Sequence, residues 1–185
     1  MNYKLIPFYR EKELYTLFYD HENSHMYKLQ HGKKSFAMFY LVILAVLFGS
    51  QYLDRIYQVY KGPFINIILF IAALIIGYII AKVIYDNYYI QDTKRKVIFD
   101  APTLREFAMK AKKQFRIEIY ACLFGVIVAI LCFALFFSIN RIQPLLIGCF
   151  SISALFIIFF MKPFRRLKML KGFIENEISN EISIK

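Results

Sequence analysis

Long apolar runs alternate with short polar segments along this chain. Each run reaches or approaches the roughly 20 residues that a helix needs to cross about 30 Å of hydrocarbon. The pattern predicts an all-α membrane protein built as a bundle of four transmembrane helices. The predicted spans are residues 36–53, 63–85, 117–139 and 144–161.

The polar segment before the first span, residues 1–35, has a strand pattern of its own. Residues 14–19 and 26–29 are strand-like and lie on either side of a turn-rich stretch, residues 20–24. Two such runs around a short turn predict a β-hairpin. A lone hairpin is marginal in water, so we expect it to pack against another polar segment or the membrane surface.

The central polar segment, residues 86–116, is predicted to hold two elements. Residues 88–91 and 97–99 are strand-like and flank a charged turn, which predicts a second hairpin that could pair with the first. Residues 102–115 place apolar side chains at helical spacing and basic side chains on the other sides. That pattern predicts a basic amphipathic helix at the inner leaflet that then turns into the third span. Residues 162–185 form a basic tail.

Composition and charge placement set the expected location. Apolar residues make up 59% of the chain, which excludes an ordinary soluble fold. The net charge of +11 could suggest nucleic acid, yet 20 of the 24 Lys and Arg lie in the two terminal segments and the central one. By the positive-inside rule these three segments are cytoplasmic, so we expect a multi-pass cell-membrane protein. Anionic lipid of the inner leaflet then accounts for the basic excess, and no nucleic-acid partner is predicted.

The second and third spans each carry small residues at four-residue spacing. Such stripes let two helix backbones approach closely in lipid, where no hydrophobic drive holds helices together. The sequence predicts that the two stripes face each other and that the fourth span also packs closely. The candidates for helix packing, or for a groove that binds a partner, are Ala73, Gly77, Ala81, Ala121, Gly125, Ala129 and Gly148.

One motif has the spacing of a zinc protease. His21-Glu22-Asn23-Ser24-His25 fits H-E-x-x-H, and His31 stands where a third ligand would follow. That chemistry needs the first two histidines on one face of a helix, whereas this motif falls between two strand-like runs. A membrane metalloprotease is therefore a remote alternative, and we predict no catalytic residue, metal or cofactor. The three cysteines lie inside predicted spans without metal-ligand spacing and are predicted to be packing residues.

Several features occur in a recognisable order: a Tyr-rich strand-like segment before the first span, then Phe48-Gly49-Ser50, Ile84-Tyr85-Asp86, the Pro-initiated basic helix and Ser138-Ile139-Asn140. This order resembles the tandem-paralogue, five-transmembrane type of firmicute membrane proteins, which includes immunity proteins against membrane-depolarising toxins of type VII secretion. The resemblance implies neutralisation of a toxin in the bilayer, and the leading function is a non-enzymatic protein that binds and neutralises a membrane-active toxin or bacteriocin. This chain has four predicted spans where that family pattern has five.

The alternative function is an accessory or permease-like subunit of a transporter, with residues 86–116 docking a cytoplasmic partner. Transporters and proton pumps generally need ionisable or helix-breaking features deep in the membrane. The sequence places no Asp or Glu at mid-membrane depth in its predicted spans. The transporter hypothesis is therefore the second choice.

Overall fold

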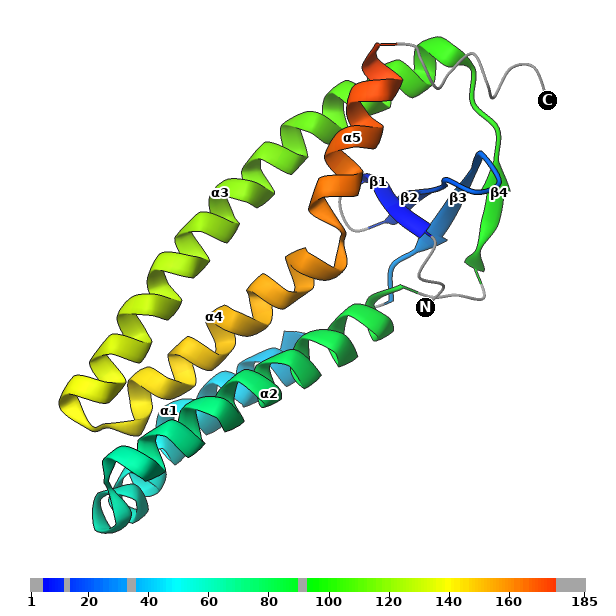
Figure 1. Ribbon diagram of the computed structural model, residues 1–185. Coiled ribbons are helices and arrows are strands. Elements are labelled where there is room, and N and C mark those ends of the chain that lie inside the picture. The colour runs from blue at the N-terminus through cyan, green and yellow to red at the C-terminus, as the bar shows by residue number, and fades with distance from the viewer. Residues whose placement is uncertain (1–4, 12–13, 33–35, 90–92, 176–185) are drawn as a thin grey trace. The chain divides into compact units, whose positions relative to one another are not determined.

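The computed structural model describes residues 5–11, 14–32, 36–89 and 93–175, with the backbone alone for 36–47. The structure is mostly helical (73%). The elements, labelled in Figure 1, are β1 (Leu5–Glu11), β2 (Tyr15–Asp20), β3 (His25–Gln30), α1 (Phe36–Tyr60), α2 (Pro63–Tyr88), β4 (Arg95–Val97), α3 (Ala101–Ile139), α4 (Ile142–Phe160) and α5 (Pro163–Ile174).

The chain divides into two compact units. The sheet unit is made of residues 1–32, 84–120 and 158–185, and the helix unit of residues 33–83 and 121–157. The sheet unit therefore gathers residues 1–32 of the first polar segment and the whole of the other two. Helix α3 begins in the sheet unit and ends in the helix unit.

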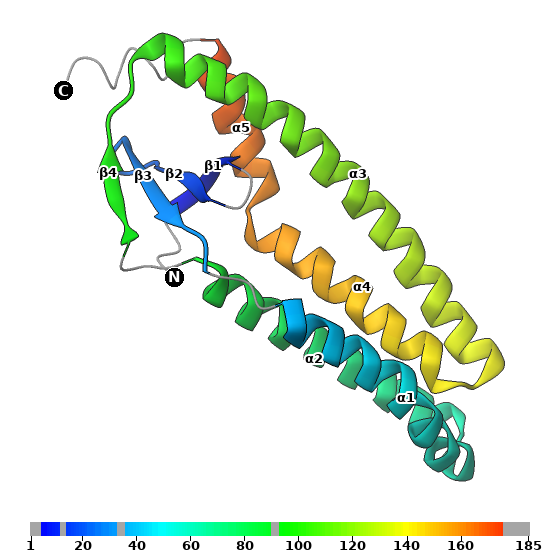
Figure 2. The ribbon, with the colours of Figure 1, turned by 180° about the vertical axis from the view of Figure 1, so that it is seen from behind.

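The sheet unit contains a four-stranded antiparallel sheet in the order β1-β2-β3-β4 (Figure 2). The predicted hairpin is confirmed: β2 and β3 pair with Asp20 opposite His25. β4 then adds to β3 with Met26 opposite Val97, so the central segment joins the N-terminal one in a single sheet. The sequence did not predict β1.

The second predicted hairpin is not formed as expected. Tyr88, assigned to its first strand, is the last residue of α2, and the partner of β4 is β3. Tyr85, Tyr88 and Tyr89 pack against the sheet cluster of Leu5, Phe18 and Leu29. A helical spacing of three and four residues places these tyrosines on one side, which favours helix over strand here. Predicted strand residues 90–91 lie outside the described residues.

The other face of the sheet carries the main core of this unit. Alternate strand residues, among them Ile6, Phe8, Leu17 and Tyr19, point to this face as the period of a strand requires. They pack against one face of α3 and against α5. The helix residues in this core are Leu104, Ala108, Ala111, Phe115, Met169, Leu170 and Phe173.

The structure changes two predictions about this region. The basic amphipathic helix forms but does not turn before the third span, because it is the first part of the 39-residue helix α3. Its apolar face is covered by protein, because the sheet and α5 bury Leu104, Ala108 and Ala111 almost completely. The predicted basic tail contains α5, whose Leu170 and Phe173 are also buried. The end of that tail, residues 176–185, lies outside the described residues.

The helix unit consists of α1, the larger parts of α2 and α4, and the second half of α3, residues 121–139. Helices α2, α3 and α4 are each long and apolar enough to cross a membrane. α4 lies between α2 and α3, and α1 lies beside α2, in both views (Figures 1 and 2). All helices that contain the predicted spans extend beyond the predicted bounds except α4, which ends one residue earlier.

Candidate functional site

The small-residue stripe of α2 packs against α4. Ala73, Gly77 and Ala81 are all buried. A Cβ atom placed on Gly77 would lie 3.2 Å from Ile152 Cγ2 and 3.3 Å from the Cys149 carbonyl oxygen. The Cys149 thiol also donates a hydrogen bond to the Ala73 carbonyl oxygen at 3.3 Å. The prediction that the α2 and α3 stripes face each other is therefore wrong.

The stripe of α3 also turns toward α4, but it is covered unevenly. Ala129 is buried, a Cβ on Gly125 would meet the Leu155 side chain at 3.3 Å, and Ala121 is exposed. Gly148 of α4 is in turn covered by the Phe133 ring, which would lie 2.7 Å from an added Cβ. The surface at Gly77, Ala81 and Gly148 is thus filled from within the chain. Ala121 is the predicted candidate that remains open.

The central position of α4 gives the physical reason. Its own small residues Gly148, Cys149 and Ser153 are buried, so helices can approach α4 on more than one side. The Ser153 hydroxyl donates back to the Cys149 carbonyl oxygen at 2.8 Å, so its polar group is satisfied inside its own helix. Small residues on α2 and α3 indicate that another helix approaches each of them closely. That helix is α4, because its own small residues allow the close approach.

Polar side chains meet at the end of the helix unit where α1 joins α2 and α3 joins α4. The Tyr57 hydroxyl donates to Asn66 Oδ1 at 2.6 Å, and Asn66 Nδ2 donates to Asn140 Oδ1 at 2.7 Å. Asn66 is only 4% exposed, so both its donor and its acceptor are used inside the protein. We call Asp54, Tyr57, Gln58, Asn66 and Asn140 the polar cluster.

The polar cluster also caps the end of α3 and the start of α4. Asn140 follows α3 with φ at 53°, a left-handed conformation that Asn tolerates better than most residues. Its carbonyl oxygen accepts a hydrogen bond from Gln58 Nε2 at 2.7 Å. Asp54 Oδ1 accepts the backbone N–H of Ile142, the first residue of α4, at 2.9 Å. A carboxylate at a helix N-terminus satisfies a free donor and complements the helix dipole.

The zinc-protease motif lies on the β2–β3 hairpin and not on a helix. His21 stands in the turn, His25 begins β3 and contacts Lys96 Nζ through Nε2 at 2.8 Å, and His31 Nε2 lies 2.7 Å from Thr16 Oγ1. No group of three metal-ligating side chains occurs among the residues that the structure describes. The hairpin geometry does not supply the single helix face that the protease chemistry needs.

The site that the structure offers is thus a set of apolar helices, with Ala121 of the α3 stripe uncovered, and a polar cluster that joins the two helix pairs. Such an arrangement can hold helices in register and bind another apolar helix. Comparison with protein-family models, with curated proteins and with solved structures finds no match to this chain.

Proposed function

We propose that this chain is a four-span cell-membrane protein with both termini in the cytoplasm that binds and neutralises a membrane-inserting toxin. Strand pairing supports the span count. β3 precedes α1 and α2 in the chain, whereas β4 follows them, and the two strands pair. Strands can pair only on one side of a membrane, so the chain between them crosses an even number of times. If α2 crosses, α1 crosses as well.

The same reasoning applies to the second helix pair. α5 follows α4 and packs in one core with the sheet and with the first part of α3. The chain therefore returns to the side of the sheet after α3 and α4. The sheet unit also collects 18 of the 24 Lys and Arg, which favours the cytoplasmic side. An alkaline phosphatase fused after residue 61 is expected to be active, because this enzyme works only outside the cytoplasm. An inactive fusion that is present in the membrane would contradict this topology.

The uncovered face of α3 carries the functional proposal. Only 11% of the most apolar stretch of α3 is buried, against 28% for α4. On that helix the covering of the small-residue stripe decreases from Ala129 through Gly125 to Ala121. A small residue that no neighbour covers lets the backbone of an inserted toxin helix approach closely. Binding there would hold the toxin helix apart from the other helices of its pore.

The transporter alternative assigned partner docking to residues 86–116, and the exposed side of the helix in that segment is the basic one. The apolar face of that segment, including Leu104, Ala108 and Phe115, is buried in the sheet unit. A partner would have to displace the sheet or α5 to reach it. The toxin-binding proposal needs no such rearrangement, because Ala121 is already open.

The experiment measures membrane potential with a voltage-sensitive dye in bacteria challenged with a membrane-depolarising toxin of type VII secretion. Cells that express the protein should keep their potential. Ala121→Leu should lose most of the protection, because the larger side chain prevents close approach. The matched control is Ala134→Leu, which makes the same change at another exposed alanine of α3 outside the stripe.

The outcomes separate the function from its location. Collapse of the potential with the wild-type protein present in the membrane would overturn the immunity function. Full protection by Ala121→Leu would leave the function standing and refute this docking position. Equal loss in Ala121→Leu and Ala134→Leu would show a general effect of bulk on α3 and would also refute it.

A further inference from the structure

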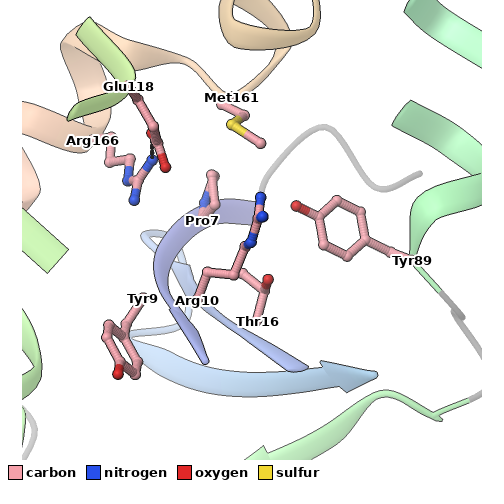
Figure 3. Close-up of a pocket in the computed structure, with 8 residues that line it drawn as sticks. All are labelled: Pro7, Tyr9, Arg10, Thr16, Tyr89, Glu118, Met161 and Arg166. Carbon is pink, nitrogen blue, oxygen red and sulfur yellow. Dashed lines mark hydrogen bonds and ion pairs between the residues drawn. The ribbon is translucent and has the colours of Figure 1, made fainter. Parts of the chain in front are cut away.

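A small cavity lies inside the sheet unit, where β1, the end of α2 and the start of α5 meet α3. Its volume is about 10 Å³, and its lining includes Arg10, Thr16, Tyr89, Glu118 and Arg166. That volume admits one water-sized group and no more. In Figure 3 the Tyr89 hydroxyl points toward the Arg10 guanidinium, and Arg166 lies beside Glu118. Sequence analysis singled out none of these residues.

Two polar atoms at this cavity are buried without a hydrogen-bond partner among the described residues: the Tyr89 hydroxyl and Arg166 Nε. Tyr89 is 3% exposed and Arg166 is 2% exposed. Leaving a buried donor unpaired costs about 1–3 kcal/mol, and more for a charged group. Buried polar groups are nearly always satisfied, so a pair of unpaired donors at one cavity indicates a missing acceptor.

The electrostatics favour an acceptor that carries negative charge. Arg166 Nη1 donates to Glu118 Oε2 at 2.5 Å, so this carboxylate is already neutralised. Arg10 adds a second guanidinium, which leaves a net positive charge at the cavity. Burial raises the pKa of Tyr89 to about 12, against the opposing effects of the Thr16 hydroxyl and the two arginines. The phenol therefore stays protonated at neutral pH and remains a donor.

A larger open groove shares two residues with the cavity. The groove has a volume of about 290 Å³ and is lined by Arg10, Gln114, Ile117 and Glu118. Gln114 fixes the backbone of β1 at this point, because its Nε2 donates to the Arg10 carbonyl oxygen at 2.7 Å and its Oε1 accepts the Arg10 N–H at 3.3 Å. Arg10 thus stands between a cavity the size of one oxygen atom and a groove that can hold a whole headgroup.

We propose that the cavity and groove form a binding site for a phosphoryl group. One phosphoryl oxygen enters the cavity and accepts hydrogen bonds from the Tyr89 hydroxyl and Arg166 Nε, while Arg10 pairs with a second oxygen in the groove. The single negative charge of a phosphodiester would balance the net charge of Arg10, Arg166 and Glu118. The phosphoryl group of an anionic phospholipid and that of a soluble compound share this chemistry.

The position of the groove on α3 favours a lipid as the source. Ile117 and Glu118 directly precede the apolar stretch of α3, which continues to Ile139. A lipid headgroup at the surface of the membrane lies at the same depth as the residues that flank a span. This site is independent of the proposed toxin binding, since it shares no residue with the Ala121 position.

The test adds phosphatidylglycerol to the full-length protein in detergent micelles and measures the bound fraction by native mass spectrometry. Arg10→Gln should weaken binding about tenfold, as expected for one charge-assisted hydrogen bond. Tyr89→Phe should weaken it severalfold with little effect on the thermal stability of the lipid-free protein, because among the described residues the hydroxyl has no hydrogen bond of good geometry to lose. Arg105→Gln is the matched control: it removes the same charge from an exposed arginine that lies on α3, outside the cavity and the groove.

Two further probes identify the source and the failure. Diacylglycerol, which lacks the phosphoryl group, should not compete. A soluble ligand would be the source if no phosphatidylglycerol binds but calorimetry shows that inorganic phosphate binds and that Arg10→Gln weakens this binding. That result would support the site. Unchanged binding in Arg10→Gln and Tyr89→Phe would overturn the proposal and leave the cavity to a water molecule. Equal weakening in Arg105→Gln would reduce the effect to general surface charge and overturn it as well.

Discussion

Replacing Asn140 tests whether the polar cluster holds the two helix pairs of the helix unit together. The residue does two separate things: its side chain accepts the hydrogen bond from Asn66 Nδ2, and its backbone adopts a φ of 53° after α3. Asn140→Gly removes the first and keeps the second, because glycine enters the left-handed region without strain. Asn140→Ala removes the side-chain bond and also strains the backbone.

The expected magnitudes follow from these contacts. In Asn140→Gly the Asn66 amide is left buried without its acceptor, which costs about 1–3 kcal/mol. The weaker contact of the Tyr57 hydroxyl with Asn140 Oδ1, at 3.3 Å, is lost as well. An alanine in the left-handed region costs roughly another 1–2 kcal/mol. The glycine variant should therefore be destabilised, and the alanine variant should be destabilised more.

The assay is reversible unfolding of the full-length protein in mixed micelles by titration with sodium dodecyl sulfate, followed by circular dichroism. Adding Asn66→Ala to Asn140→Gly completes a double-mutant cycle, whose coupling energy should be about 0.6–2 kcal/mol for a hydrogen bond between membrane helices. A glycine variant as stable as the wild type would refute the role of the side chain. Equal stability of the glycine and alanine variants would refute the role of the backbone.

Two other predictions concern packing and pH. Gly77→Ala should lower the free energy of unfolding by about 1–3 kcal/mol, because the added methyl group overpacks against the Ile152 side chain and the fixed Cys149 carbonyl. Gly49→Ala, which has nothing within 4 Å, should raise it by up to about 1 kcal/mol in the same titration. Equal effects of the two variants would contradict this packing. Burial opposes ionisation of Asp20, but hydrogen bonds from the Asn23 side chain and the Glu22 backbone hold the pKa of Asp20 below its usual value. Its charged form therefore stabilises the fold above the unfolded pKa of about 3.9, and this stability is lost as pH falls through the lower folded value. Asp20→Asn should flatten that acid loss in thermal unfolding followed at neutral and acid pH, and an unchanged loss would assign it to other carboxylates.

The parts of the fold that the sequence predicts well are those with a simple period. Alternation in β2 and β3 around a polar turn predicts their hairpin, and the apolar runs predict the three helices able to cross a membrane. β1 escapes prediction because its register shifts between Pro7 and Tyr9. The bulge places Phe8 and Tyr9 in the same core, which breaks the period of two.

The sites are harder to predict because each is assembled from distant segments. A small-residue stripe indicates that a helix approaches, but it does not say which one, and both stripes pack on α4. In the sequence, Asp54, Asn66 and Asn140 are ordinary polar residues near the ends of spans. Their hydrogen bonds join three different parts of the chain, so the sequence does not show that they meet. The same is true of Arg10, Tyr89 and Arg166, which come together to line one cavity only when the sheet unit folds.

The length of α3 gives a physical reason for the protein cover on its amphipathic part. A helix of 39 residues is roughly 58 Å long, about twice the thickness of the hydrocarbon. If the stretch that ends at Ile139 crosses the membrane, about 20 residues suffice, and the helix upstream of residue 119 lies outside. A straight helix cannot turn onto the surface there, so its apolar face needs a protein cover, which the sheet and α5 provide. Glu118 then stands at the boundary between the two parts, where a lipid phosphate would meet Arg10 and Arg166.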